Sequence, residues 1–251
     1  IAKMEKKTGK KWNSTKNPLL VSVRSGAAIS MPGMMDTILN LGLNEKTVEG
    51  FAEQTKNPRF SWDSYRRFIQ LFGKVVFGVN DEKFDHVLNS AKKKQGVIDD
   101  SKLNVESLKK IVSEYKKICE KHTKRKFPDT PDEQLVLSIE AVFKSWMGER
   151  AIVYREKNNI TKDIANGTAV NVVTMVFGNR GDDSATGVVF TRNGSNGKKE
   201  IEGEYLINAQ GEDVVAGVRT GKNIDLLKKD MPKSHKELSN ACSKLEKHFR
   251  E

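Results

Sequence analysis

Residues 19–43 read L-L-V-S-V-R-S-G-A-A-I-S-M-P-G-M-M-D-T-I-L-N-L-G-L. Residues 19–23 form an apolar run behind the chain-breaking pair Asn17-Pro18, which predicts a short buried strand. Residues 37–43 form a second short apolar segment. The stretch between them holds three methionines around a Pro-Gly pair, so it is predicted to be a loop that joins two extended elements.

Arg24 is predicted at the end of the first strand, where its planar guanidinium could bind phosphate oxygens in pairs. Gly26 and Gly33 permit backbone conformations that point N–H groups at an anion. Flexible side chains can repack as such a loop opens and closes, and the loop offers three: Met31, Met34 and Met35. The residues thus predict a phosphate-binding arginine beside a mobile loop. The alternative is an ordinary surface loop whose arginine pairs with a carboxylate.

The rest of the chain divides into a helical middle and a strand-rich end. Helical periodicity or capping signals predict helices from Ser61, from the N-cap Asn104 and from Thr130-Pro131. Runs of β-branched and aromatic residues predict strands. A last helix is predicted from Ser234, with a buried face formed by Leu238, Ala241, Cys242, Leu245 and Phe249. The predicted strands are residues 151–155, 169–177, 187–191 and 204–207. This order favours an α+β fold over a regular βαβ alternation.

A polar segment, N-A-Q-G-E-D at residues 208–213, follows the last predicted strand. It combines two amides, a glycine and the adjacent carboxylates Glu212 and Asp213. Such a set could hold a ribose, a metal ion or a lysine partner. It could equally be a polar turn.

Composition narrows the class of protein. The 251 residues carry a net charge of +11, and residues 92–126 hold 12 lysine and arginine residues against 5 acidic ones. These lysines are predicted on polar helix faces without aromatic side chains between them, which favours a solvent-exposed face over a nucleic-acid surface. No apolar run approaches the roughly 20 residues of a membrane span. The four histidines lack the spacing of metal ligands, and Cys119 and Cys242 are predicted to be buried, reduced thiols.

Several longer motifs resemble the nucleotide-binding domain of the pyruvate, phosphate dikinase family, a family of phosphoenolpyruvate-utilising enzymes. The likeness begins with V-S-V-R-S-G-A-A-I-S-M-P-G-M-M-D-T-I-L-N-L-G-L-N at residues 21–44 and covers nearly the whole chain. It continues in order through N-P-R-F-S-W-D-S-Y-R-R-F (57–68), F-K-S-W (143–146), R-A-I-V-Y-R (150–155), G-T-A-V-N-V-V-T-M-V-F-G-N (167–179) and G-E-Y-L-I-N-A-Q-G-E-D-V-V-A-G-V-R-T (203–220).

The resemblance implies an ATP-grasp fold, in which two α+β subdomains clamp ATP and the first contains a helical insert. The implied boundaries are residues 1–43 for part of the first subdomain, 44–129 for the insert, 130–173 for the return to the first subdomain and 174–251 for the second. The implied reaction uses ATP, Mg²⁺ and phosphate to phosphorylate a histidine on another domain. Pyruvate then becomes phosphoenolpyruvate, with AMP and diphosphate as the other products.

The resemblance also implies roles for individual residues. Arg24 matches an arginine that contacts the ATP phosphates and acts in catalysis. A glycine-rich lid is implied at Gly33, with Met31, Met34 and Asp36. The other positions that match ATP-binding residues are Arg67, Thr174, Met175, Val176, Glu212 and Asp213.

The chain is predicted to be a piece of a longer protein. Ile1 lies in a lysine-rich segment of helical character, and Glu251 follows a predicted helix without a sequence signal that ends it. The resemblance places an ATP-binding lysine before Ile1 and the acidic metal ligands after Glu251. No metal ligand is therefore predicted within the chain, which alone is predicted to be inactive. Expected partners are the phosphohistidine and pyruvate-binding domains of the same protein, which is expected to be a homodimer in the cytoplasm, a glycosome or a plastid.

Two other functions stay open at this point. One is a dikinase of the phosphoenolpyruvate synthase type, which uses water in place of phosphate. The other is a basic nucleic-acid-binding module. One departure from the family pattern is Gly194, which stands where the family usually has proline, so that a looser turn is expected there.

Overall fold

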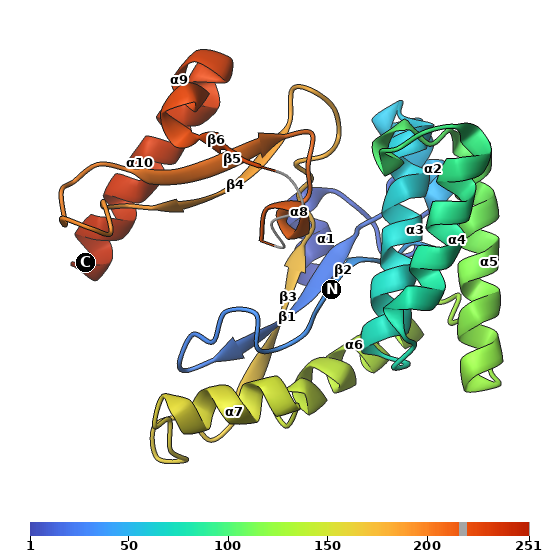
Figure 1. Cartoon of the computed structure of the whole chain (residues 1–251), viewed down its shortest axis with the longest axis horizontal. Coiled ribbons are helices and arrows are strands. Elements are labelled where there is room, and N and C mark those ends of the chain that lie inside the picture. The colour runs from blue at the N-terminus through green and yellow to red at the C-terminus, as the bar shows by residue number, and fades with distance from the viewer. Residues whose placement is uncertain (216–219, 251) are drawn as a thin grey trace. The chain divides into compact units, whose positions relative to one another are not determined.

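Figure 1 shows the computed structural model, which describes residues 1–215 and 220–250. The chain folds as two compact units, Ile1–Met175 and Val176–Glu251. Helices and antiparallel strands occur in both, so the predicted α+β class is confirmed.

The first unit is built on a three-stranded antiparallel sheet in the order β2-β1-β3. Its strands are β1 (Val21–Ala27), β2 (Thr37–Leu41) and β3 (Thr168–Thr174). The predicted strand–loop–strand arrangement is confirmed. Arg24 does not end the first strand, however, but lies inside it, opposite Thr37 and Asn171. Pairing with β3 keeps β1 extended as far as Ala27, and a contact so distant in sequence leaves no local signal.

Between β2 and Pro131, the first unit contains a group of four helices and one short 3₁₀ turn, Asp100–Lys102. They are α2 (Glu45–Thr55), α3 (Pro58–Val75), α4 (Asp81–Gln95) and α5 (Val105–Thr123), and a short helix α1 (Ala2–Thr8) precedes the sheet. The predicted cap at Asn104 is confirmed. Helix α3 begins at Pro58, three residues before Ser61, because the Asn57 side chain accepts the Phe60 N–H and proline suits the first helical position.

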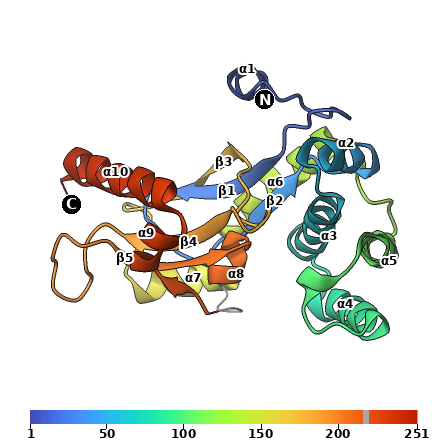
Figure 2. The ribbon, with the colours of Figure 1, turned by 90° about the horizontal axis from the view of Figure 1, so that it is seen from above.

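Helix α3 is the centre of this helical group. It packs against α2 and α5, as Figure 2 shows, and buries the aromatic rings Tyr65, Phe68 and Phe72. The helix also contacts β2. Side chains on its polar face are therefore placed rigidly relative to the sheet.

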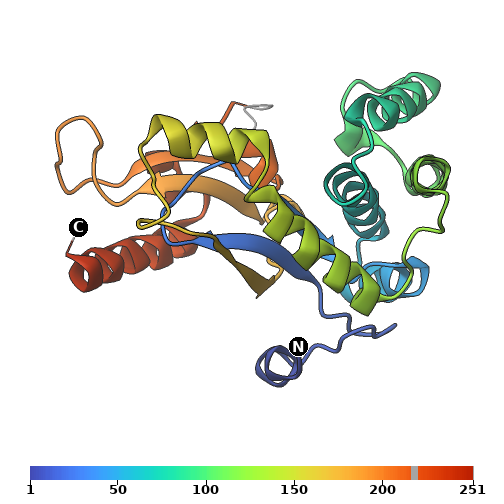
Figure 3. The same cartoon turned by 90° about the horizontal axis from the view of Figure 1, so that it is seen from below.

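Helix α6 (Pro131–Ser145) returns to the sheet and contacts all three strands (Figure 3). Its predicted start is confirmed, since Thr130 caps the helix by accepting the Glu133 N–H. Gln134 on α6 is fully buried and accepts the Gly42 N–H at 3.1 Å. This hydrogen bond joins α6 to the residue that follows β2.

The strand predicted at residues 151–155 is wrong, because this segment is part of helix α7 (Glu149–Lys157). Only Ala151 of this helix is buried, so its apolar residues do not line a sheet. Acidic and basic residues at the two helix ends complement the helix dipole. The Arg155 guanidinium also stacks 4.1 Å above the Trp146 ring and donates to the Trp146 carbonyl.

The second unit is an antiparallel sheet in the order β4-β5-β6 with helices against it. Its strands are β4 (Ala185–Phe190), β5 (Glu202–Ile207) and β6 (Lys222–Asn223). Its helices are α8 (Gly211–Val215), α9 (Leu227–Asp230), α10 (Pro232–Phe249) and the 3₁₀ turn Ile224–Leu226. The strands predicted at 187–191 and 204–207 are thus confirmed to within a few residues.

Helix α10 differs from its prediction in two ways. It begins at Pro232, before Ser234, because proline occupies its first turn. Leu245 and Phe249 were expected on a buried face but are 50% and 63% exposed. The buried residues are instead Cys242 and Glu246, whose carboxylate pairs with two basic side chains of the β4–β5 loop.

None of the helices in the described ranges has both the length and the apolar character that a membrane span requires. Both cysteines are buried free thiols, as predicted.

Candidate functional site

Arg24 projects from the middle of β1 with an exposed side chain. Its Nε donates to the Ser22 hydroxyl at 3.2 Å. Among the residues that the structure describes, no carboxylate forms an ion pair with it. The guanidinium is therefore held by its own strand and remains able to bind an anion.

The loop between β1 and β2, residues 28–36, contains one buried side chain and a turn at glycine. Met31 is only 5% exposed, and its carbonyl accepts the Met34 N–H in a turn. Gly33 has a φ of +72°, a conformation that glycine adopts without strain, and a Cβ there would meet open space. The loop thus combines a buried methionine anchor with an open glycine turn.

Arg150 joins this loop to helix α7. Its Nη1 donates to the Gly33 carbonyl at 3.3 Å, and its Nη2 lies 3.2 Å from the Asp36 carboxylate. The Asp36 N–H also donates to the Ser145 hydroxyl at the end of α6. One arginine therefore fixes the loop at its glycine and at its last residue. Arg150 is not among the predicted site residues, because no local sequence signal relates it to the loop.

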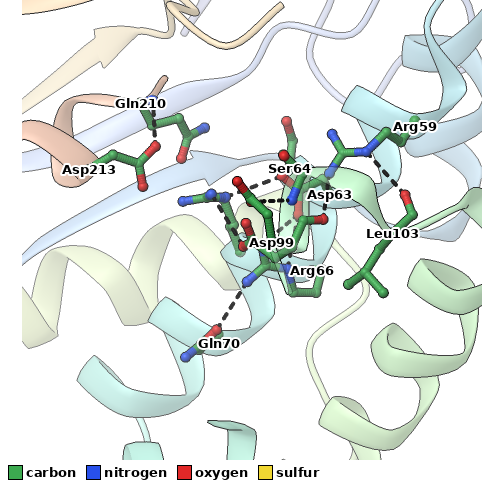
Figure 4. A network of polar contacts seen from close by, with 12 residues as sticks. Arg59, Asp63, Ser64, Arg66, Gln70, Asp99, Leu103, Gln210 and Asp213 are labelled. Carbon is green, nitrogen blue, oxygen red and sulfur yellow. Dashed lines mark hydrogen bonds and ion pairs between the residues drawn. The ribbon is translucent and has the colours of Figure 1, made fainter. Parts of the chain in front are cut away.

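Arg67 lies on α3 in a network of arginines and carboxylates. Figure 4 labels other members of this network, among them Arg59, Asp63 and Arg66. Its Nε is 3.3 Å from Asp63 Oδ2, and its Nη2 is 3.6 Å from Asp100 Oδ2. Arg66 binds the same two carboxylates, at 2.5 Å from Asp63 and 2.9 Å from Asp100. Arg59 completes the network by donating to the carbonyls of Asp100 and Leu103.

The charged groups of this network shift one another's pKa. Burial alone would raise the pKa of Asp63, but Arg66, Arg67 and Arg59 outweigh it and lower the pKa to about 2. Burial works in the opposite direction on Arg66, and Asp63 outweighs it to raise the pKa of the guanidinium. Arg66 and Arg67 thus share the carboxylates of Asp63 and Asp100, which hold Arg67 in place.

Thr174, Met175 and Val176 do not all lie on a strand as predicted. Strand β3 ends at Thr174, which pairs with Val21. Met175 is buried and donates its N–H to the Leu20 carbonyl at 2.9 Å, whereas Val176 is 87% exposed. The ladder ends here because β1 begins at Val21 and offers no further partner.

The segment at residues 208–213 is a turn that leads into helix α8. Its backbone is fixed by two bonds, from the Asn208 N–H to the Ser184 carbonyl and from the Ala209 N–H to the Gly178 carbonyl. Asp213 Oδ2 accepts the Gln210 N–H at 2.9 Å, so this carboxylate closes the turn (Figure 4). The side chain of Glu212 lies outside the described part of the chain.

The structure therefore brings the loop, Arg150 and the ends of α6 and α7 together, and separately joins Arg67 to its carboxylates. No group of three or more His, Cys, Asp or Glu side chains within residues 1–215 and 220–250 is arranged to hold a metal ion.

Comparison with known proteins fits a nucleotide-binding arrangement. Residues 1–250 match the family described as pyruvate phosphate dikinase, AMP/ATP-binding domain. The chain belongs to this family. It is 54% identical to the pyruvate, phosphate dikinase of Clostridium symbiosum over 252 residues, which cover 100% of this chain and 29% of that protein.

Other relatives agree. The Entamoeba histolytica pyruvate, phosphate dikinase is 52% identical, over 99% of this chain and 28% of its own length. The chloroplastic pyruvate, phosphate dikinase 1 of Arabidopsis thaliana is 50% identical, over 99% of this chain and 25% of its own length. The chain thus spans less than a third of the length of these curated relatives.

Proposed function

We propose that this chain binds ATP as part of a pyruvate, phosphate dikinase, with Arg24 as its principal phosphate-binding residue. The observation that carries the proposal is the exposed Arg24 guanidinium, which forms no ion pair with the described residues and lies on the strand that leads into the Gly33 loop. The family is an AMP/ATP-binding domain, which supports a nucleotide as the anion.

The proposed whole reaction converts ATP, phosphate and pyruvate into AMP, diphosphate and phosphoenolpyruvate through a phosphorylated histidine on another domain. Relatives that carry the name of this enzyme are more than three times as long as the region matched, which leaves room for phosphohistidine and pyruvate-binding domains. An ATP-grasp arrangement, a homodimer and a cytoplasmic or organellar location belong to the same proposal.

Phosphoryl transfer asks the protein for positioning and charge neutralisation. Arg24 would neutralise phosphate oxygens, and Arg67, which its carboxylate partners hold in place, is proposed near them. The loop at Gly33 would act as a lid that excludes water. Thr174, Met175 and Val176 are proposed near the adenine, and Glu212 and Asp213 near the nucleotide.

Magnesium accompanies ATP in such reactions. The described residues offer no cluster of carboxylates for it, and Asp213 is occupied in closing its own turn. No magnesium ligand is therefore proposed among the described residues.

Neither alternative gains support from the structure. A water-using dikinase of the phosphoenolpyruvate synthase type is less favoured, because the relatives carry the phosphate-dependent name. The basic residues of α4 and α5 lie largely on exposed helix faces. Nucleic-acid binding would show a steep loss of affinity with added salt, which a titration against a DNA duplex would detect.

The test is phosphate transfer in the intact protein from ATP labelled at the β-phosphate. Arg24→Ala should slow labelling of the protein by roughly a hundredfold or more, because a charge aimed at the phosphates is lost. Arg125→Ala removes an exposed arginine from the loop after α5 and should leave the rate unchanged. Normal labelling of the Arg24→Ala protein would refute the assignment.

A further inference from the structure

Gln210 is a buried residue whose side chain finds no partner among the described residues. It is 5% exposed, and neither Nε2 nor Oε1 finds a hydrogen bond in the described part of the chain. Its backbone, by contrast, is satisfied, since the Gln210 N–H donates to Asp213 (Figure 4). The fold has therefore ordered the residue and left its carboxamide unused.

An unused buried carboxamide opposes folding. The group carries two donor hydrogens and two acceptor lone pairs, all of which water satisfies in the unfolded chain. Burying them without partners costs free energy, whereas a leucine or methionine of similar volume would not. The fold gains nothing from a glutamine here, so a ligand is the natural partner for it.

Gln134 shows how this chain buries a glutamine for structural reasons. It is fully buried, and its Oε1 accepts the Gly42 N–H at 3.1 Å. Its Nε2 donates to the carbonyls of Leu43 and Pro128 at 3.1 and 3.0 Å. The side chain of Gln134 is thus fully hydrogen-bonded, whereas that of Gln210 has no hydrogen bond to the described residues.

A second unpartnered amide atom belongs to Asn179, on the segment whose backbone bonds to Ala209. Asn179 Oδ1 is buried and has no hydrogen-bond partner in the described residues. The Ala209 N–H donates to the Gly178 carbonyl at 2.9 Å. Gln210 and Asn179 are therefore each the next residue after one of two hydrogen-bonded neighbours. The contact is close, because a Cβ on Gly178 would lie 2.5 Å from the Ala209 carbonyl oxygen.

An exposed apolar side chain, Val176, lies shortly before these residues in the chain. Val176 is two residues before Gly178 and is 87% exposed. The beginning of the second unit therefore offers one exposed apolar side chain and two amides with free hydrogen-bonding capacity. This combination suits a flat ring with apolar faces and a polar edge.

The chemistry of the carboxamide selects among the parts of a nucleotide. A phosphate offers only acceptors, which would leave the Gln210 oxygen opposite another oxygen. The edge of adenine offers an amino donor beside a ring-nitrogen acceptor, and glutamine pairs with both at once. The corresponding edge of guanine presents two acceptors and cannot satisfy the amide oxygen.

We propose that Gln210 recognises the adenine edge and selects adenine over guanine, with the Asn179 oxygen as an additional acceptor. This inference rests on the proposed function, since it requires that the chain bind a nucleotide. It adds a residue and a specificity to that function.

The test compares Gln210→Leu and Gln210→Met with the wild type in the intact protein. Binding of ATP, of GTP and of the ATP analogue that lacks the exocyclic amino group is measured by calorimetry. Loss of a paired hydrogen bond should weaken ATP binding by about tenfold and reduce the preference for ATP over GTP. The wild type should bind the analogue more weakly than ATP, and the variants should no longer distinguish the two.

Thermal unfolding without nucleotide supplies the second readout. Both Gln210 variants should melt at a higher temperature than the wild type, because an unsatisfied buried group is removed. The matched control, Gln134→Leu, should melt at a lower temperature and keep the preference for ATP over GTP.

The outcomes separate the two proposals. If the wild type binds no ATP, the proposed function itself fails. If ATP binds and depends on Arg24, but the Gln210 variants keep the wild-type affinity and preference, the Gln210 inference alone is overturned. Equal loss of ATP and GTP affinity would also overturn it.

Discussion

Asp63 and Arg67 lie one helical turn apart on α3, with Asp63 Oδ2 3.3 Å from Arg67 Nε. The other oxygen of the same carboxylate is bound by Arg66. Asp63→Asn would remove the charge of the carboxylate that these two guanidinium groups share. We expect a loss of about 3 kcal/mol in the free energy of unfolding, measured with urea, because a buried charge pair is broken from one side. Glu133→Gln, at an exposed position on α6, should change it by less than about 0.5 kcal/mol.

The same carboxylate predicts a pH dependence. Its pKa in the folded protein is about 2, below the value of about 4 for an unfolded chain. Stability from this group is therefore fully present above pH 4 and is lost as the pH falls towards 2, by roughly 2 kcal/mol. Urea unfolding between pH 5 and pH 2 should show a smaller loss in Asp63→Asn than in the wild type. Parallel pH profiles for the two proteins would contradict the prediction.

Arg150 should control how often the Gly33 loop opens. Its pair with Asp36 is partly exposed, so Arg150→Ala should cost less than about 1 kcal/mol of global stability. The local effect should be larger, because Met31 is buried only while the loop is closed. Peroxide should oxidise Met31 severalfold faster in Arg150→Ala, as followed by mass spectrometry.

Two internal comparisons make that measurement specific. Met147 is 66% exposed in the closed structure, so its oxidation rate should be the same in both proteins. Lys157→Ala removes an exposed cation from the same helix without touching the loop. If Met31 oxidises at the wild-type rate in Arg150→Ala, the arginine does not hold the loop.

The sequence predicts those parts of the site that depend on neighbours along the chain. The strand–loop–strand unit around Arg24 follows from alternating apolar runs and a Pro-Gly turn, and the structure contains it. Helix caps such as Asn104 are local in the same sense. The Asp63–Arg67 pair also has a local sequence signal, because carboxylate and guanidinium groups four residues apart meet on one helix face.

Contacts between distant segments explain the failures. Residues 151–155 carry strand-forming side chains, yet no strand pairs with them and they form α7. Asp100 reaches Arg66 from 34 residues away, and Arg150 reaches Asp36 from 114 residues away. The burial of an unpartnered Gln210 likewise depends on the folded surroundings, which the motif around it does not reveal.

The β4–β5 loop gives the last prediction, because Gly194 stands where the family usually has proline. Its N–H donates to Glu202 Oε2 at 2.8 Å, a bond that proline cannot form. The turn is further closed by Asn193, whose side chain accepts the N–H groups of Ser195 and Asn196. The glycine is therefore part of a bonded turn.

Gly194→Pro sets two effects against each other. Loss of a hydrogen bond to a charged acceptor should lower the free energy of unfolding by about 1.5–3 kcal/mol. Proline also restricts the unfolded chain, which should raise the free energy of unfolding by about 0.4–1 kcal/mol. The variant should therefore lose about 1 kcal/mol in urea unfolding. Gly194→Ala keeps the N–H, and its Cβ would lie 3.7 Å from the nearest atom, Glu202 Oε2. That control should stay within about 0.5 kcal/mol of the wild type, and a stabilised proline variant would show that the bond to Glu202 contributes little.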